Sequence, residues 1–127
     1  LDRDTRLNDG ELALGPLASF IRDRQIHLEM APTCNTQIGA VNSVAEHPVI
    51  PFMRAGFNVG VNTDNRLMSD VSPSSELVAL HEAHRLSWAD IEQLVTNAIS
   101  SGFAPLTERQ LIIENIVAPA FSSLANG

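Results

Sequence analysis

The chain has a single cysteine, no long apolar run and few basic residues, and each shortage excludes a class of protein. With Cys34 alone, no internal disulfide can form, which fits a reducing compartment, and we expect a cytoplasmic location. No apolar stretch approaches the ~18 to 20 residues of a membrane span, so no membrane-spanning segment is expected. The charged first residues, LDRDTRLNDGE, argue against a signal peptide.

Basic residues are outnumbered, because 8 Lys and Arg stand against 15 Asp and Glu, giving a net charge of -7. Nucleic acids and anionic membranes attract basic surfaces, so neither is expected as a partner. A metal cation or a neutral ligand of nucleoside size remains compatible with an acidic protein. Since 44% of the 127 residues are hydrophobic and only 18% are charged, a packed core is expected.

The hydrophobic pattern predicts two short strands among several helices. Residues 26–30, IHLEM, and 57–61, FNVGV, alternate in character and are bounded by turn residues. Strands that alternate with helices predict right-handed crossovers and a parallel sheet, hence an α/β fold. Residues 1–10 and the segment 31–47 are predicted to be irregular.

Capping signals predict the boundaries of the last helices. Ser87 followed three residues later by Asp90 is typical of a capping box, and Thr107 with Gln110 forms a second one. Pro119 is predicted to end the final helix, because proline lacks the N–H that a helix interior requires.

Two strands make an incomplete sheet. Both edges stay open, and so small a sheet cannot cover its helices. We therefore expect residues 1–127 to form one partial domain whose N-terminal half is absent. Either that missing half or another copy of the chain would complete the sheet. Apolar surface should be exposed at the sheet edges and on the helices that would meet the missing part.

Polar residues gather after both predicted strands, where ligands bind in parallel α/β folds. The first loop carries Thr33, Cys34, Asn35, Thr36 and Gln37, and the second carries Asn62, Thr63, Asp64 and Asn65. Asp64 is the candidate ligand-binding carboxylate. Asp64 and Asn65 are also typical of an Asx-turn, and the spacing leaves both interpretations open.

Other titratable residues carry weaker signals. The sequence HEAH at 81–84 lacks the four-residue His spacing of metalloproteases, so we interpret it as a solvated helix face. His27 and His47 have no partner that the sequence reveals. We interpret Cys34 as a partly buried small residue rather than a nucleophile. Glu29 could act in acid–base chemistry only if its side chain pointed into the site.

Four segments, LEMAPTCNTQIGAV, HPV, GFNVGVNTDN and NAISSGFAPLTERQLI, resemble in order and spacing the C-terminal part of a bacterial adenosine deaminase. The resemblance covers essentially residues 12–121. It implies the C-terminal part of a TIM (β/α)8 barrel, with residues 26–30 and 57–61 as about strands seven and eight and a C-terminal helical tail. It also implies a metal-dependent hydrolase of purine metabolism that converts adenosine to inosine and ammonia.

The resemblance assigns roles to two neighbouring residues. Asp64, in the N-T-D motif, matches the carboxylate that binds Zn²⁺ and takes part in catalysis. Asn65 matches a substrate-binding position that resembles a donor to purine N7, although many members carry a second Asp there. A carboxamide donates a hydrogen bond at any pH, whereas a carboxyl group donates only when it is protonated. Asn65 therefore preserves the donor.

Most of the family's zinc and catalytic residues have no counterpart in this chain. No His-x-His pair occurs, and none of the 4 His matches one of the family's zinc-binding or catalytic histidines. A single carboxylate does not hold zinc, and a TIM barrel needs ≈ 250 residues. We therefore expect the isolated chain to be inactive and zinc-free, and the full-length protein to be the deaminase.

Two alternatives remain open from the sequence. One is a deaminase of adenine or of a modified adenosine, because the family's ribose-contacting residues lie outside this chain. The other is a non-catalytic truncated barrel that assembles with another chain.

Overall fold

The computed structural model of the chain describes residues 4–8 and 11–125. The elements in chain order are β1 (Thr5–Asn8), β2 (Glu11–Leu14), α1 (Pro16–Asp23), β3 (Leu28–Met30), α2 (Pro32–Gln37), the 3-10 turn η1 (Val44–Glu46), α3 (Val49–Arg54), β4 (Val59–Val61), α4 (Arg66–Ser69), α5 (Pro73–His84), α6 (Trp88–Ser100), α7 (Leu106–Ile112), the π-helical turn η2 (Ile113–Val117) and α8 (Ala118–Ala125).

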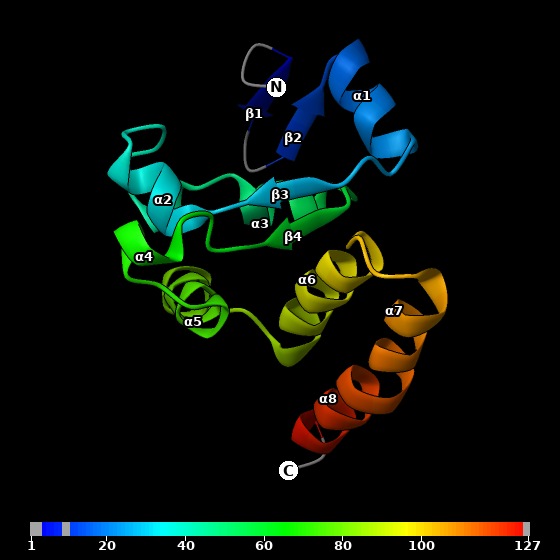
Figure 1. Cartoon of the computed structure of the whole chain (residues 1–127). Coiled ribbons are helices and arrows are strands. Elements are labelled where there is room, and N and C mark those ends of the chain that lie inside the picture. The colour runs from blue at the N-terminus through cyan, green and yellow to red at the C-terminus, as the bar shows by residue number, and fades with distance from the viewer. Residues whose placement is uncertain (1–3, 9–10, 126–127) are drawn as a thin grey trace.

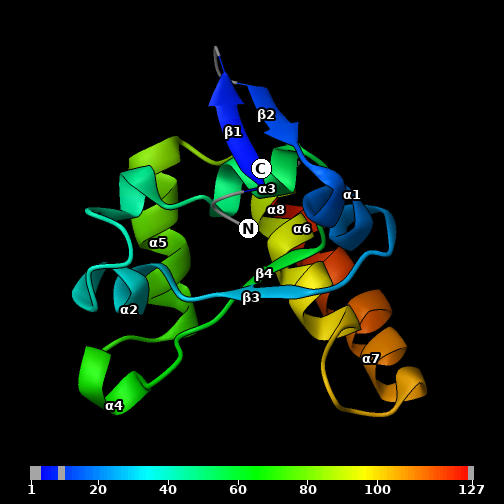
Figure 2. The ribbon, with the colours of Figure 1, turned by 90° about the horizontal axis from the view of Figure 1, so that it is seen from above.

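Strands β3 and β4 form a parallel two-stranded sheet, which confirms the predicted α/β class. Leu28 pairs with Val59 and Met30 with Val61, so the two strands end level with each other. The Asn62 amide donates to the Met30 carbonyl at 2.9 Å, which extends the pairing one residue further. Both polar loops therefore leave the sheet at the same end, where α2 and α4 lie in both views (Figures 1 and 2).

Helices cover both faces of β4. Because side chains alternate along a strand, Val59 points to one face and Gly60 to the other. Val59 is fully buried in the core that α3 contributes to. Gly60 faces α6, and a Cβ added at Gly60 would lie only 3.0 Å from the Cβ of Ala98 and 2.7 Å from the His27 ring. Glycine thus permits α6 to approach the sheet closely.

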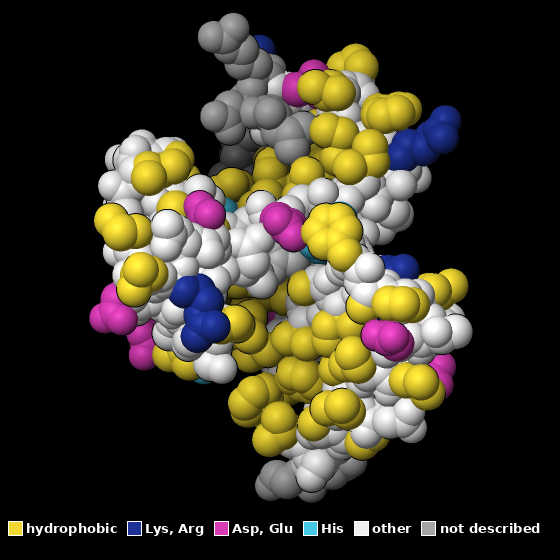
Figure 3. Space-filling view, viewed as in Figure 1, with side chains coloured by type: hydrophobic (Ala, Val, Ile, Leu, Met, Phe, Trp, Pro, Cys, Tyr) yellow, Lys and Arg dark blue, Asp and Glu magenta, His cyan; other side chains and the backbone are white. Residues whose placement is uncertain are grey.

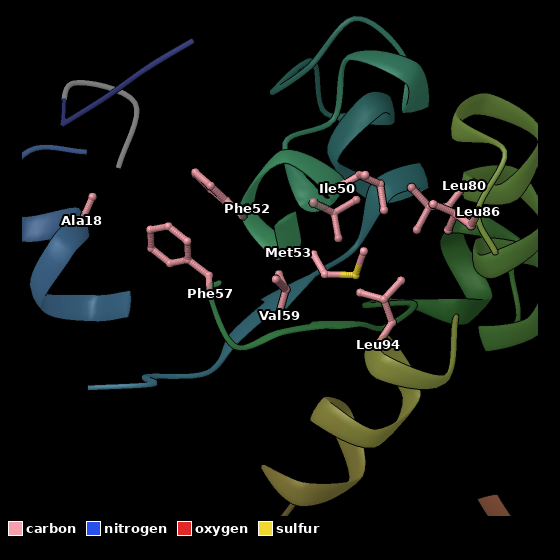
Figure 4. Packing of buried hydrophobic residues seen from close by; sticks show 10 residues of the cluster. Ala18, Ile50, Phe52, Met53, Phe57, Val59, Leu80, Leu86 and Leu94 are labelled. Atoms are coloured by element: carbon pink, nitrogen blue, oxygen red, sulfur yellow. The ribbon is translucent and has the colours of Figure 1, made fainter. Parts of the chain in front are cut away.

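The core joins α1, α3, β4, α5 and α6, and Met53 of α3 points toward Leu94 of α6 (Figure 4). The rings of Phe52 and Phe57 lie 5.0 Å apart in a tilted arrangement. The buried residues of the core are Ala18, Val49, Ile50, Phe52, Met53, Phe57, Val59, Leu80, Leu86 and Leu94. This core fixes the sheet against α3 and α6, and so fixes the position of the strand ends.

The first segment differs from the prediction of irregular structure at residues 1–10. Residues 5–8 form β1, which pairs antiparallel with β2 in a separate sheet, in the register Asn8 with Glu11. The remaining residues of that prediction, 1–3 and 9–10, lie outside the described part of the chain, while Asp4 precedes β1.

The prediction of an irregular segment at 31–47 was wrong in two places. Residues after β3 form α2, with Pro32 at its first position, and the turn η1 forms further along. Ser43 caps η1, because its side chain accepts a hydrogen bond from the Glu46 amide. Proline at the start of a helix costs no hydrogen bond, which is why α2 can begin directly at the strand end.

The predicted helix boundaries near the C-terminus were right once and wrong twice. Ser87 and Asp90 form the capping box. Thr107 lies inside α7, whose first residue follows Pro105 without a side-chain cap. Pro119 does not end the helix. The chain continues through Pro119 into α8, because the π-helical turn η2 relaxes the backbone just before the proline.

Hydrophobic side chains are exposed over the helices, as predicted for a partial domain. Yellow side chains spread over the surface of the C-terminal helices and of α1 (Figure 3). Large exposed residues include Leu17, Phe20, Ile26, Trp88, Phe103, Leu106, Leu111 and Ile116. Within the described residues, neither β3 nor β4 has a second neighbour in its sheet, so both edges are open. Within residues 4–8 and 11–125, no helix is long and apolar enough to cross a bilayer.

Candidate functional site

A polar depression of about 430 Å³ lies at the end of the sheet where β3 and β4 stop. The end of β3, the residue after it and helix α2 contribute Glu29, Ala31 and Asn35, and the loop after β4 contributes Asn62, Thr63 and Asp64. The parallel register brings these two segments together. The predicted gathering of polar residues after the strands thus forms one shared surface.

Asp64 is exposed at this depression, three residues after β4 ends. Its backbone adopts a left-handed conformation, with φ of 51°, and its amide donates to Asn62 Oδ1 at 3.0 Å. An Asx-turn is therefore present, but Asn62 builds it rather than Asp64 and Asn65. The turn orients Asp64 and leaves its carboxylate free for other contacts.

The Asp64 carboxylate contacts helix α2 through Cys34. The Cys34 thiol donates to Asp64 Oδ2 at 3.1 Å. This hydrogen bond to the carboxylate, with smaller effects of desolvation and of the negative charge, raises the pKa of the Cys34 thiol above its usual value. Cys34 is half-buried, as predicted. A thiol that keeps its proton is a poor nucleophile, and here it acts as a donor to Asp64.

Asn65 caps the short helix α4. Its Oδ1 accepts a hydrogen bond from the Met68 amide at 3.2 Å, and its side chain is exposed. The cap uses the carbonyl oxygen of the carboxamide. Because no described residue accepts from Asn65 Nδ2, the two N–H donors of this side chain remain available to a ligand.

A buried histidine supports Asn35 of helix α2. His47 is 3% exposed, and its Nε2 lies 2.8 Å from Asn35 Oδ1. The Val49 amide donates to His47 Nδ1 at 3.3 Å. Burial, with a smaller effect of His84, lowers the pKa of His47 below its usual value, so the ring is neutral at pH 7.

Glu76 of α5 is a second buried support for the loop after β3. Its side chain is 0% exposed, and its Oε2 accepts a hydrogen bond from the Thr33 amide at 3.1 Å. Thr33 lies in the first turn of α2, where backbone amides have no partner within the helix. Glu76 therefore fastens the start of α2 to α5.

The other histidines are engaged away from the depression. His81 Nδ1 lies 2.9 Å from the Leu86 carbonyl and His84 Nε2 lies 3.3 Å from the Val44 carbonyl. His27 Nδ1 lies 2.9 Å from Asn58 Oδ1, beneath the sheet near α6. Across residues 4–8 and 11–125, no three His, Cys, Asp or Glu side chains cluster closely enough to hold a metal ion. The exposed Asp64 carboxylate suits one position in a larger ligand set.

Sequence reasoning missed the supports beneath the depression. The contacts of His47 with Asn35 and of Glu76 with Thr33 join residues from different elements, so no local spacing reveals them. Glu29 was named from the sequence only as a conditional candidate and was not expected to act in the site. It lines the depression beside Asp64, which is the condition that acid–base chemistry at Glu29 requires.

Comparison with known proteins identifies relatives of the whole chain. The profile of the family described as adenosine deaminase matches residues 5–119. An adenosine deaminase from Mycobacterium sp. (strain KMS) is 45% identical over 125 residues, which are 98% of this chain and 34% of that protein. An adenosine deaminase from Mycobacterium tuberculosis (strain H37Rv) is 47% identical over 116 residues, which are 91% of this chain and 32% of that protein.

The chain thus spans about a third of the length of the curated relatives that it matches. Among solved structures, adenine deaminase from Arthrobacter aurescens superposes with a TM-score of 0.77 at 21% identity. The superposition covers 87% of this chain and 32% of that one. At this identity the likeness concerns the fold.

The contact between Cys34 and Asp64 predicts the reactivity of the thiol. Asp64→Asn removes the negative charge that holds the proton on sulfur, so the thiol pKa should fall and the thiolate fraction at pH 8 should rise. We expect alkylation of Cys34 by iodoacetamide to become severalfold faster, as measured by mass spectrometry over time. Asp70→Asn is the matched control and should leave the rate unchanged. Equal rates for both variants would contradict the contact.

Proposed function

Because this chain belongs to the adenosine deaminase family, we propose that the full-length protein is a zinc-dependent deaminase that hydrolyses adenosine to inosine and ammonia. The chain would be the C-terminal part of its TIM barrel, with β3 and β4 as strands seven and eight. The observation that carries the proposal is the family match over residues 5–119, combined with an exposed carboxylate in a polar depression at the strand ends.

Asp64 would be one of the zinc ligands. It is exposed, it lies at the carboxyl end of β4, and Cys34 binds only its Oδ2. When bound, zinc supplies a water molecule whose pKa is lowered toward neutrality. Asp64 would also accept a hydrogen bond from that water, which orients a lone pair toward the purine. Both tasks need an anionic oxygen, so an uncharged residue at this position would fail.

Asn65 would donate a hydrogen bond to an acceptor nitrogen of the purine. Its Oδ1 accepts a hydrogen bond from the Met68 amide, which fixes the orientation of the carboxamide. The N–H groups on Nδ2 are then left to donate to a ligand. An adjacent zinc ligand and purine donor would fix the base relative to the attacking water. The loop after β4 would thus contribute to catalysis by orienting the substrate.

The remaining zinc ligands would come from the two-thirds of the relatives that this chain does not match. That part would also cover the open edges of β3 and β4 and the exposed apolar residues of α1 and α6. The isolated chain would then be inactive. A non-catalytic module completed by another copy of the chain would bury the same surface, and the intact mass of the natural polypeptide separates the two.

Deamination of adenine is the second candidate, because the fold superposes on an adenine deaminase. Sequence similarity favours adenosine, since the relatives at 45% and 47% identity are adenosine deaminases. Adenosine and adenine share the purine ring and its N7 acceptor, so a hydrogen bond from Asn65 does not distinguish the two substrates. Comparing kcat/KM for adenosine and adenine in the full-length protein decides between them.

Zinc content tests the role of Asp64. The full-length protein should contain about one zinc per chain. When it is mixed with adenosine, the absorbance of adenosine should fall as the substrate is converted. Asp64→Ala should lower the zinc content severalfold and reduce kcat at least about 10³-fold, because a ligand and a water acceptor are lost. Asp70→Ala, the matched exposed carboxylate, should retain both. A folded Asp64→Ala protein with full zinc and activity would refute the assignment.

The pH dependence of substrate binding tests Asn65. Asn65→Asp keeps the cap of α4, because a carboxylate oxygen still accepts from the Met68 amide. It loses the permanent donor, so KM at pH 7.5 should rise about tenfold. Since only the protonated carboxyl donates, KM should improve as the pH falls and worsen as the pH rises through the carboxyl pKa. An unchanged KM profile would remove Asn65 from the substrate site.

A further inference from the structure

One buried contact near the depression is not used by the proposed chemistry. It connects the buried His47 to Asn35 of α2, which lines the depression. Buried polar groups such as the His47 ring are normally hydrogen-bonded. Because the partner here is a side chain that lines the depression, the ring also orients a group that can face a ligand.

The hydrogen bonds fix the tautomer of His47. The Val49 backbone N–H can only donate, and it points to His47 Nδ1 at 3.3 Å, so Nδ1 carries no proton. In the neutral ring the proton therefore sits on Nε2, which donates to Asn35 Oδ1 at 2.8 Å. A neutral ring also agrees with the lowered pKa that burial gives His47.

The tautomer in turn fixes the orientation of the Asn35 carboxamide. Asn35 must present its oxygen to the donating Nε2, so its amide group faces the other way with both hydrogens. No described residue accepts a hydrogen bond from Asn35 Nδ2, although Asn35 is half-buried. A flipped carboxamide would place two donors against each other and leave an acceptor toward the depression.

We propose that Asn35 is a specificity-determining residue that donates an N–H to a hydrogen-bond acceptor of the bound purine nucleoside, and that His47 is the positioning residue that fixes its carboxamide. The inference rests on the proposed function for its ligand. Among the lining residues that follow β3 or end it, Glu29 is the other polar side chain, and its carboxylate can only accept, so Asn35 supplies the side-chain donor on this side of the depression.

Steady-state kinetics of the full-length protein with adenosine test the donor. Asn35→Asp keeps an acceptor for His47 Nε2 but has no N–H, so KM should rise about tenfold or more at pH 7.5. Thermal melting of the variant should remain near that of the parent, because the buried contact is preserved. A parental KM in this variant overturns the role of Asn35.

A double-mutant cycle tests the link to His47. His47→Leu removes both ring contacts and should raise KM by a similar factor. His47→Gln keeps a donor and an acceptor, so its KM should stay close to that of the parent. Combining His47→Leu with Asn35→Ala should cost no more in KM than Asn35→Ala alone. His81→Leu, whose ring contacts the Leu86 carbonyl, is the control and should combine additively. Additive effects of His47 and Asn35 on KM overturn the positioning role.

The outcomes separate this inference from the proposed function. A parent protein without deaminase activity would refute the proposed function and remove the nucleoside ligand that the inference requires. An active parent whose Asp64→Ala variant is dead, but whose Asn35→Asp variant has an unchanged KM, would refute the inference alone. Nitrogen chemical shifts of the His47 ring give a readout independent of activity, and a protonated Nδ1 would contradict the tautomer.

Discussion

The parallel pairing of β3 with β4 is the constraint on which the candidate site depends. Three residues of each strand pair in register, and the hydrogen bond from Asn62 to the Met30 carbonyl carries the pairing to the strand ends. Both following loops therefore start side by side. A shift of one residue would turn Val59 out of the core and Gly60 away from α6, so the packing of both helices enforces the register.

Buried groups hold the segments that follow the strands in place. The carboxylate of Glu76 binds the first turn of α2, and the ring of His47 binds the Asn35 side chain. Above them, the thiol of Cys34 links the first loop to Asp64 in the second. The exposed side chains at the ligand surface are thus oriented by partners that are themselves buried or engaged, which is what preorganised binding requires.

Prediction from sequence succeeded where local chemistry decides the structure. The alternation in FNVGV, the Ser87 capping box and the polar residues after both strands identified the sheet, α6 and the location of the depression. It failed where a neighbour overrides local preference, as at Pro119, where η2 lets the helix continue. It also could not find the pair of His47 and Asn35, because tertiary folding alone brings a buried ring to that loop. The zinc and substrate roles of Asp64 and Asn65 stay predictions.

The central claim is that the Asp64 carboxylate is one corner of a zinc site completed by other parts of the full-length protein. Anomalous diffraction at the zinc absorption edge, measured on crystals of that protein, tests it most directly. We predict a single strong peak about 2.0 to 2.2 Å from an Asp64 carboxylate oxygen, at the carboxyl end of β4. Zinc bound elsewhere, with Asp64 turned away from it, would contradict the account.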